Sequence, residues 1–577
     1  MSCKIIPWIA LAGLLLASLA CEVAPAVSPP AAPAAAPQET QEPRRAAEAA
    51  KAATAAPQVI EKSVEKIVEK QMAATKAPAA AAPAPARAAA ATSAPAAPAP
   101  AAPAAAPTKA PLPTAGSTAA PSPADMFFKE YGVNPFIATQ DDHLSTFALD
   151  VDTASYALAR RYVTDGNLPP KEAVRVEEFV NYFRQDYPYP PKGRAFAIHL
   201  DAAPFPFAET DKHRLLRVGI QGYDVPPDQR KPAVLTFVID VSGSMADGGR
   251  LELVKNTLEN LVEMLRGDDS VAIISYDTNA RTVLAPTPGT ERGKIIEAIR
   301  SLKPLGSTNA EAGLRMGYQQ AAAAFRDGAI NRVILASDGV ANVGQTGPES
   351  IWAQIEGSAA KGINLTAVGV GMGNYNDVLL EQLADHGKGV YAYVDTPKEA
   401  QRIFVQNLTG TLQAIAEDAK AQLDFNPDVV ARYRLLGFEN RAIEDTQFRV
   451  ETGKAAQIGA GHHVTALYEI ELRPDAAGRI ATVYLRWKDP DTKEVIENKQ
   501  PFETQAVAPT FTSASPRLQW SAIVAEYAEI LRASPFAKGS TLAAVLEEAQ
   551  RASRLLPGDA DVTEFVQLVQ RANGLKK

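Results

Sequence analysis

Near the middle of the chain stands the segment Val234-Leu235-Thr236-Phe237-Val238-Ile239-Asp240-Val241-Ser242-Gly243-Ser244. Its first six residues are almost all apolar, which is typical of a parallel strand buried on both faces. Polar residues follow directly at the end of this predicted strand. In an open sheet of parallel strands, ligands bind just beyond the carboxyl ends of the strands. The segment therefore predicts a buried central strand with a polar site at its end.

Helical and strand patterns alternate on the carboxyl side of this segment. The predicted helices are 251–265, 295–302, 310–325, 351–360, 378–385 and 398–416. The predicted strands are 271–276, 332–337, 363–370 and 390–394. This succession indicates an α/β domain built on a doubly wound parallel sheet. We expect the domain to span residues 231–417.

Five oxygen-bearing side chains fall at strand ends or loop tips of this predicted domain. They are Asp240, Ser242 and Ser244 after the first strand, Thr308 in Gly306-Ser307-Thr308-Asn309, and Asp338 in Ala336-Ser337-Asp338-Gly339. Together they resemble the metal-ion-dependent adhesion site (MIDAS) of a von Willebrand factor A domain. The alternative is that the two aspartates cap helices while the hydroxyls satisfy buried backbone groups. Capping does not require all five residues together.

The resemblance implies a role for each of the five residues. The hydroxyls of Ser242, Ser244 and Thr308 would bind a cation directly, and Asp240 and Asp338 would act largely through water. Mg²⁺, with Mn²⁺ or Ca²⁺ as alternatives, is a hard cation that prefers oxygen ligands. Neutral ligands leave much of its charge unquenched, so an open position can accept an Asp or Glu carboxylate from a protein partner.

The sequence favours binding over catalysis at this site. We find no Gly-x-x-x-x-Gly-Lys-Ser/Thr phosphate loop and no Gly-x-Ser-x-Gly nucleophile turn. The glycine-rich segment 369–373 follows a late strand and is interpreted as a turn. The histidine pair His462-His463 is predicted at a loop or strand start, where neighbouring side chains point to opposite faces. We therefore expect no enzyme, and a metal-dependent hydrolase is the weakest alternative.

Both flanks of the A domain carry further elements. Strands are predicted at 145–151, 196–200, 216–220, 464–472 and 483–487, and helices at 154–164 and 173–183. Asp150 is interpreted as a strand end, and Asp152-Thr153 as a helix cap before 154–164. We expect an α+β domain at 126–230, a β-rich domain at 418–515 and a helical region at 516–577. Because each side has few strands, we expect 190–225 and 418–515 to pair into one β-sandwich into which the A domain is inserted.

Motifs in these flanks are similar to those of a widespread family of bacterial envelope lipoproteins. They are LSTFALDVDTASY (144–156), VRVEEFVNYF (174–183), YRLLGFENR (433–441) and IGAGH (458–462). In that family a von Willebrand factor type A domain lies between its own associated N-terminal domain and a C-terminal domain of unknown function. The resemblance covers 126–577. It implies a multidomain fold, with the α/β domain inserted between β-rich segments and followed by helices.

The amino-terminal part has a different character. Lys4 and the apolar run 5–20 are typical of a signal peptide, residues 1–20. Ser18-Leu19-Ala20-Cys21 resembles the bacterial lipoprotein cleavage box, so we expect Cys21 to carry a lipid anchor. An ordinary cleaved signal or an uncleaved anchor is the alternative. Residues 21–125 are rich in Ala and Pro and contain no Phe, Tyr or Trp, which predicts a disordered linker.

The composition of the whole chain limits its function. Its 577 residues carry a formal net charge of −8, which argues against a nucleic-acid binder, and two cysteines exclude a disulfide scaffold. The leading hypothesis is a lipid-anchored protein on the periplasmic or cell-surface side of a membrane. It would bind a protein partner as an adhesin or scaffold. The alternative is an envelope assembly or chaperone-like cofactor that holds a client or an ATPase.

Overall fold

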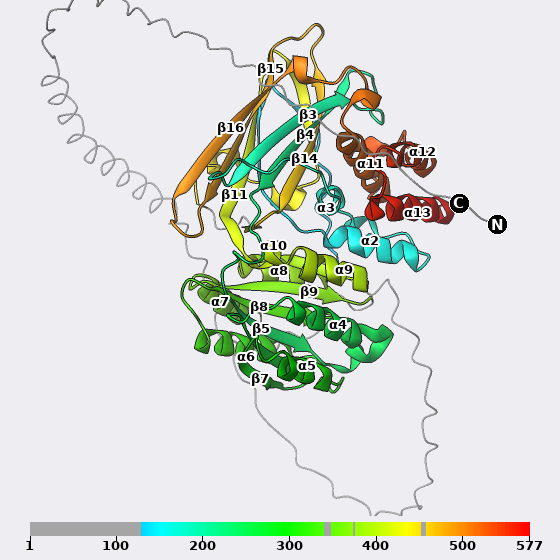
Figure 1. The fold of residues 1–577 in the computed structure, drawn as a ribbon. Coiled ribbons are helices and arrows are strands. Elements are labelled where there is room, and N and C mark those ends of the chain that lie inside the picture. Colours follow the sequence, from blue (N-terminus) through cyan, green and yellow to red (C-terminus); the bar gives the residue numbers. More distant parts are fainter. Residues whose placement is uncertain (1–127, 340–347, 373–375, 452–456, 577) are drawn as a thin grey trace, which may run out of the picture. The chain divides into compact units, whose positions relative to one another are not determined.

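The computed structural model describes residues 128–339, 348–372, 376–451 and 457–576 of the chain (Figure 1). The predictions for the signal peptide, for Cys21 and for the Ala/Pro-rich linker fall outside these residues. Within the described ranges, no helix is both long and apolar enough to cross a membrane.

A six-stranded sheet forms the centre of the A domain, in the order β10-β9-β8-β5-β6-β7. Its strands are β5 (Ala233–Asp240), β6 (Ser270–Tyr276), β7 (Ala280–Pro288), β8 (Ile330–Ser337), β9 (Ile363–Val370) and β10 (Tyr391–Val394). The doubly wound α/β fold is confirmed, but the sheet is mixed, because β7 runs antiparallel to β6 at the edge. The sequence does not reveal β7, since this edge strand is largely exposed and lacks a continuous apolar run.

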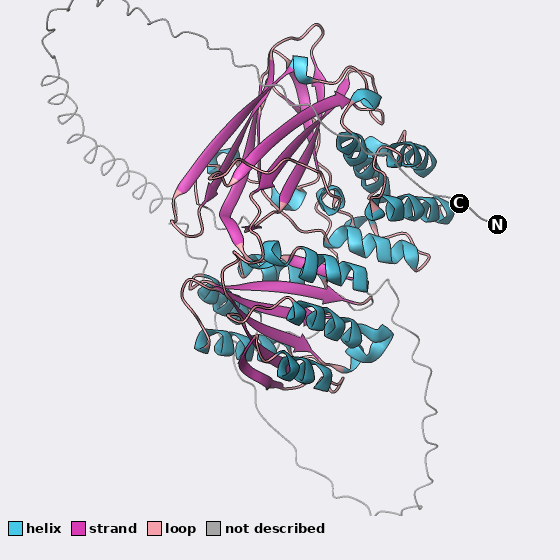
Figure 2. Ribbon diagram, in the orientation of Figure 1, coloured by secondary structure: helices cyan, strands magenta, loops and turns pink. Residues whose placement is uncertain are grey.

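Helices cover both faces of this sheet (Figure 2). They are α4 (Arg250–Glu263), α5 (Arg292–Ser301), α6 (Ala310–Ala323), α7 (Pro348–Ala359), α8 (Asp377–His386), α9 (Pro397–Gln401) and α10 (Leu408–Leu412). Successive residues of β5 enter opposite cores, as the pleat of a strand requires. Phe237 belongs to the apolar cluster with Leu258 of α4, and Val238 to the cluster with Leu314 of α6.

The predicted helix 398–416 is shorter and broken in the structure. A π-helical turn (Arg402–Gln406) separates α9 from α10, and β11 (Ala414–Phe425) begins immediately after α10. The backbone is tightly packed here, since a Cβ on Gly459 would lie 1.8 Å from the carbonyl oxygen of Gly410. Residues 414–416, predicted as the end of this helix, are therefore the start of β11.

The strands on both sides of the A domain form one β-sandwich. Its remaining strands are β1 (Ile137–Ala138), β2 (Leu144–Ala148), β3 (Phe196–Pro204), β4 (His213–Gly222), β12 (Val430–Leu436), β13 (Ile458–Gly459), β14 (His463–Leu472), β15 (Arg479–Lys488) and β16 (Val495–Glu503). One sheet has the order β1-β12-β14-β4-β3, and in the other β11 pairs with β2, β13 and β15. Because β4 pairs with β14 and β2 with β11, the A domain is inserted into the sandwich, as the sequence analysis expects.

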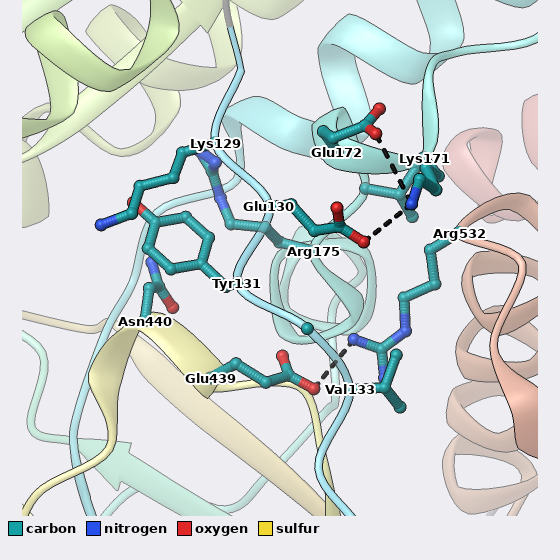
Figure 3. Close-up of a pocket in the computed structure, with 12 residues that line it drawn as sticks. Lys129, Glu130, Tyr131, Val133, Lys171, Glu172, Arg175, Glu439, Asn440 and Arg532 are labelled. Atoms are coloured by element: carbon teal, nitrogen blue, oxygen red, sulfur yellow. Dashed lines mark hydrogen bonds and ion pairs between the residues drawn. The ribbon is translucent and has the colours of Figure 1, made fainter.

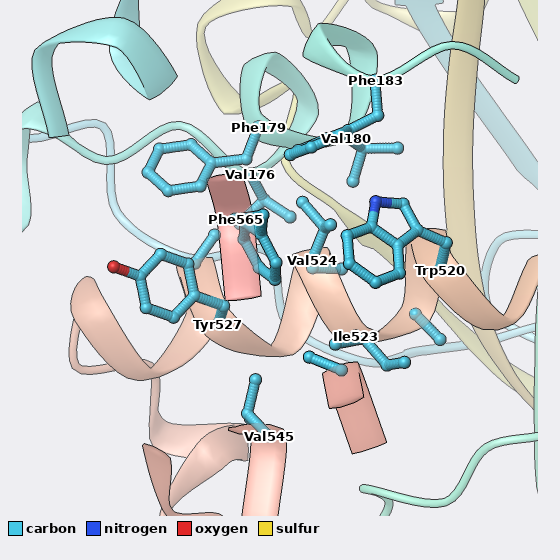
Figure 4. Packing of buried hydrophobic residues seen from close by; sticks show 14 of the residues in the cluster. Val176, Phe179, Val180, Phe183, Trp520, Ile523, Val524, Tyr527, Val545 and Phe565 are labelled. Atoms are coloured by element: carbon cyan, nitrogen blue, oxygen red, sulfur yellow. The ribbon is translucent and has the colours of Figure 1, made fainter. Parts of the chain in front are cut away.

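The C-terminal helices share a core with the first helices of the flank (Figure 4). α11 (Pro516–Leu531), α12 (Leu542–Ser553) and α13 (Ala560–Leu575) pack with α2 (Ala154–Thr164) and α3 (Val176–Tyr182). The ring of Phe183 lies 5.8 Å from that of Trp520 and 5.4 Å from that of Phe565. Segments 126–230 and 516–577 thus each supply part of the same apolar cluster.

Buried ion pairs join α8 of the A domain to the flanking segments. Arg175 pairs with Asp377 at 2.9 Å, and Arg441 pairs with Glu381 at 3.2 Å and with Asp385 at 2.9 Å. The three acidic residues are spaced four apart, so they lie on one face of the helix. That face is one of the A domain's contacts with its flank, and Arg160 of the flank makes another through Asp395 and Glu399.

Asp150 and Asp152 belong to the same charged cluster. Both carboxylates pair with Arg441, at 2.9 and 3.3 Å, and Asp152 also accepts a hydrogen bond from the backbone amide of Tyr391. The residue that caps α2 is Thr153, and its side chain makes no capping hydrogen bond. The predicted cap Asp152-Thr153 therefore lies at the right place, since Thr153 is the N-cap residue, but Asp152 contributes no cap because its carboxylate pairs with Arg441.

Candidate metal centre

The predicted site lies where two neighbouring parallel strands end. Asp240 is the last residue of β5, and Asp338 follows β8 directly. These strands are hydrogen-bonded neighbours, with Ile239 opposite Ala336, so both carboxylates emerge at the same edge of the sheet. Ser242 and Ser244 occupy the turn between β5 and α4. Strand order alone thus brings together four of the five predicted residues.

The spacing of the oxygens fits the coordination shell of a small cation. The Oγ atoms of Ser242 and Ser244 lie 3.2 Å apart, and Ser244 Oγ lies 3.1 Å from Oδ1 of Asp338. Adjacent ligands of an octahedral Mg²⁺ at 2.0–2.1 Å would be about 2.9 Å apart. The two serine hydroxyls therefore fit neighbouring corners of such an octahedron with only a small adjustment, and Asp338 lies beside them within hydrogen-bond distance of Ser244.

Asp240 is held rigidly behind these residues. Its Oδ1 accepts a hydrogen bond from the backbone amide of Ser242 at 2.8 Å, and its Oδ2 accepts one from the Ser337 hydroxyl at 2.8 Å. The side chain is buried, and this desolvation raises the pKa of Asp240 to about 6. A cation beside it would favour the charged carboxylate. Because both carboxylate oxygens already accept hydrogen bonds, Asp240 suits a role in which it acts on a cation through a bridging water.

Thr308 is positioned by its loop and is half-buried. The backbone amide of Gly243 donates to the carbonyl oxygen of Gly306 at 3.0 Å, so this loop lies against the serine turn. Gly306 has a positive φ of 75°, and on the other side Asn309 caps α6. Among the described residues, no hydrogen bond joins the Thr308 hydroxyl to the other four predicted ligands.

Sequence reasoning missed Arg250, the first residue of α4. Its Nη1 donates to Oδ2 of Asp338 at 2.6 Å and to the carbonyl oxygen of Ser244 at 3.2 Å. No signal in the sequence links positions 250 and 338, which lie in different loops and meet only in the folded sheet. The site therefore contains a built-in cation as well as carboxylates and hydroxyls.

The oxygen atoms at the site determine which metal ions it suits. Within the described ranges, no group of three or more His, Cys, Asp or Glu gathers that could hold a metal. A cation held by Ser242 and Ser244 would depend on hydroxyl oxygens for part of its shell. Hydroxyl and carboxylate oxygens suit Mg²⁺, Mn²⁺ or Ca²⁺ better than softer metals.

The histidine pair lies elsewhere, in a hollow of about 490 Å³. His463 is the first residue of β14, as predicted, and its Nε2 lies 3.3 Å from the carbonyl oxygen of Phe183. Desolvation lowers the pKa of both His462 and His463 to about 4, so both rings are neutral at pH 7.

A second pocket lies beside the segment 129–133 and is much smaller (Figure 3). Three ion pairs border it, Lys171 with Glu130 at 2.7 Å and with Glu172 at 3.7 Å, and Glu439 with Arg532 at 2.9 Å. Its volume is about 40 Å³, whereas sites for small organic ligands usually measure about 300–1,000 Å³. This pocket is too small for such a ligand.

Comparisons with known proteins agree with this architecture. Residues 235–406 match the family model for the von Willebrand factor type A domain, and residues 122–217 match one described as von Willebrand factor. Residues 410–478 and 473–575 match the model for the C-terminal part of the uncharacterized protein YfbK. YfbK of Escherichia coli is 36% identical over 496 residues, which cover 82% of this chain and 85% of YfbK.

More distant relatives share only part of the chain. The uncharacterized protein sll0103 of Synechocystis is 32% identical over 33% of this chain and 45% of its own length. Inter-alpha-trypsin inhibitor heavy chain H2 of Mus musculus is 26% identical over 32% of this chain and 20% of its own length. Among solved structures, a von Willebrand factor type A protein from Catenulispora acidiphila has a TM-score of 0.40 at 16% identity, covering 64% of this chain and 89% of that protein.

Proposed function

Because this chain belongs to the bacterial von Willebrand factor A-domain family that includes YfbK, we propose that it is a protein-binding component of the cell envelope. The A domain supports a role in protein interaction or adhesion. Its binding site would be the cluster at the ends of β5 and β8. The observation that carries the proposal is the spacing of 3.2 and 3.1 Å between the Ser242, Ser244 and Asp338 oxygens.

In this proposal Ser242, Ser244 and Thr308 hold a divalent cation directly, and Asp240 and Asp338 support it from behind. When bound, Mg²⁺ supplies a positive charge with an exchangeable coordination position. Ser244 is exposed, so an acidic side chain of a partner could reach this position from solvent. We assign the site no catalytic step.

The anchoring of the chain is a separate part of the proposal. We infer that Cys21 is lipidated and that residues 21–125 connect the anchor to the folded part. The support is the sequence Ser18-Leu19-Ala20-Cys21 after an apolar run. A Cys21→Ala variant should lose labelling by a fatty-acid analogue and leave the membrane fraction, and labelling that survives this change would contradict the anchor.

The binding proposal is tested by capture of partners from envelope extract, with and without Mg²⁺. The bait is the wild-type chain, Asp338→Ala or the control Asp247→Ala, which removes an exposed carboxylate from the same turn. We expect a partner that is retained by the wild type and the control only when Mg²⁺ is present, and never by Asp338→Ala. Retention that persists in EDTA would contradict the proposal.

A further inference from the structure

Arg250 connects three loops of the candidate metal centre. Besides Asp338 Oδ2 and the Ser244 carbonyl, its guanidinium donates to the carbonyl oxygen of Met372, which follows β9. Its side chain is only 11% exposed. Three contacts and this degree of burial distinguish it from a surface arginine that happens to lie near an aspartate.

The backbone leaves room for this side chain. Gly371 has a positive φ of 82°, and a Cβ at this position would lie 2.3 Å from Nε and 2.6 Å from Cδ of Arg250. Gly248 and Gly249, directly before the arginine, also have positive φ values, of 58° and 73°. Gly248 and Gly249 therefore let the chain turn into α4 at Arg250. Gly371, in the turn after β9, leaves space for the aliphatic part of the Arg250 side chain.

The two carboxylate oxygens of Asp338 contact different neighbours. Oδ1 faces the hydroxyl of Ser244, and Oδ2 faces the guanidinium. Among the side chains in the cluster, Asp240 and Asp338 contribute one negative charge each when ionised, and Arg250 contributes one positive charge. The cluster then carries a net charge of minus one without a cation and plus one with a divalent cation. Without Arg250 the occupied cluster would be neutral.

We propose that Arg250 weakens the hold of the cluster on its cation and strengthens the attraction of the occupied cluster for a carboxylate ligand. This inference rests on the proposed function, because it concerns the same site. The guanidinium repels the cation through space, and it competes for the charge of Asp338. The occupied cluster keeps a positive charge that only an external anion compensates. Binding of cation and acidic ligand is thereby made cooperative.

The first test is titration of the full chain with Mn²⁺, followed by electron paramagnetic resonance of the free ion. Arg250→Met keeps most of the stem and removes the charge, so we expect its Kd for Mn²⁺ to fall tenfold or more, which corresponds to about 1.4 kcal/mol. Arg250→Lys keeps the positive charge but loses the planar guanidinium group with its several donors. Its Kd for Mn²⁺ should stay near the wild-type value. Excess acetate, compared with chloride at equal ionic strength, should tighten Mn²⁺ binding in the wild type more than in Arg250→Met.

The second test measures thermal unfolding in EDTA and in Mg²⁺. Arg250→Met leaves a buried carboxylate without its cation, so its melting temperature should fall in EDTA and recover in Mg²⁺. The matched control is Arg230→Met. It removes another buried arginine–aspartate pair, with Asp269 at 2.6 Å, from the opposite ends of β5 and β6. Its deficit in melting temperature relative to the wild type should be the same in EDTA and in Mg²⁺.

The outcomes separate this inference from the proposed function. If the wild type binds Mn²⁺ and Arg250→Met binds it equally or more weakly, the inference is overturned while the cation site stands. The same holds if Arg250→Lys behaves like Arg250→Met, because charge is then not the cause. If Arg250→Met binds Mn²⁺ and the wild type does not, the inference is supported, because removing the arginine charge then creates measurable cation binding. If neither protein binds Mn²⁺, the inference and the proposed cation site both fail.

Discussion

The substitution Arg441→Met tests how the A domain is held in its flank. The guanidinium pairs with four carboxylates, those of Asp150, Asp152, Glu381 and Asp385, at 2.9 to 3.3 Å. Arg441, Asp150 and Glu381 are each at most 6% exposed. Removing one partner of a buried ion pair costs roughly 3–5 kcal/mol, because a charge is left uncompensated. Because the substitution leaves several carboxylates without their partner, we expect the free energy of unfolding to fall by an amount in the upper half of that range at pH 7.5.

The pH dependence of this defect has a definite sign. Burial raises the pKa of Asp385 from its usual value to about 6, even with Arg441 present, and raises the pKa of Asp152 as well. A carboxyl group whose pKa is raised on folding contributes stability below its unfolded pKa and loses it as pH rises through the folded pKa. The deficit of Arg441→Met should therefore be smaller at pH 5 than at pH 7.5.

The assay is urea denaturation followed by circular dichroism at both pH values. The matched control is Arg449→Met, since Arg449 pairs with Glu497 at 2.8 Å but its side chain is 63% exposed. Such a surface pair contributes about 0–1 kcal/mol. A deficit for Arg441→Met below about 1 kcal/mol, or one that grows on acidification, would refute this reasoning.

Three other changes probe the rest of the fold. Trp520→Ala should cost about 3–5 kcal/mol by calorimetry, because the fully buried ring joins the C-terminal helices to α3; a cost like that of a surface substitution would contradict the shared core. Gly459→Ala should lower the soluble yield and the melting temperature, since its Cβ would lie 1.8 Å from the Gly410 carbonyl oxygen. Glu526→Gln should stabilise the chain relative to the wild type at pH 9 but much less at pH 6. Burial raises the pKa of Glu526 to about 8, so the wild type loses stability as pH rises through that value; equal unfolding midpoints at pH 9 would contradict this.

Much of the A domain follows from its sequence. The apolar run before Asp240 predicts β5, and the residues after each strand predict which side chains meet at the edge of the sheet. This works because parallel strands end on the same side and because buried strands need continuous apolar segments. The exposed strand β7 and the broken helix after Pro397 escape such reasoning, since their packing depends on partners elsewhere in the chain.

Pairings between distant charges could not be predicted. Glu381 and Asp385 lie on the predicted helix 378–385 and Asp377 directly precedes it, and such an acidic row in isolation resembles a solvated face. Their partners Arg175 and Arg441 lie in other segments, and only the folded chain shows that Asp377 and Glu381 are buried. Arg250 escapes prediction for the same reason, because ion pairs between loops leave no periodic signal in a sequence.

The most direct test of the central claim is anomalous diffraction from crystals of the protein soaked in Mn²⁺. If the oxygens at the ends of β5 and β8 bind a divalent cation, a peak should lie within about 2.3 Å of the Ser242 and Ser244 hydroxyl oxygens and be absent from crystals of Ser242→Ala. A peak located only elsewhere on the protein, or none at these serines at saturating Mn²⁺, would contradict the claim.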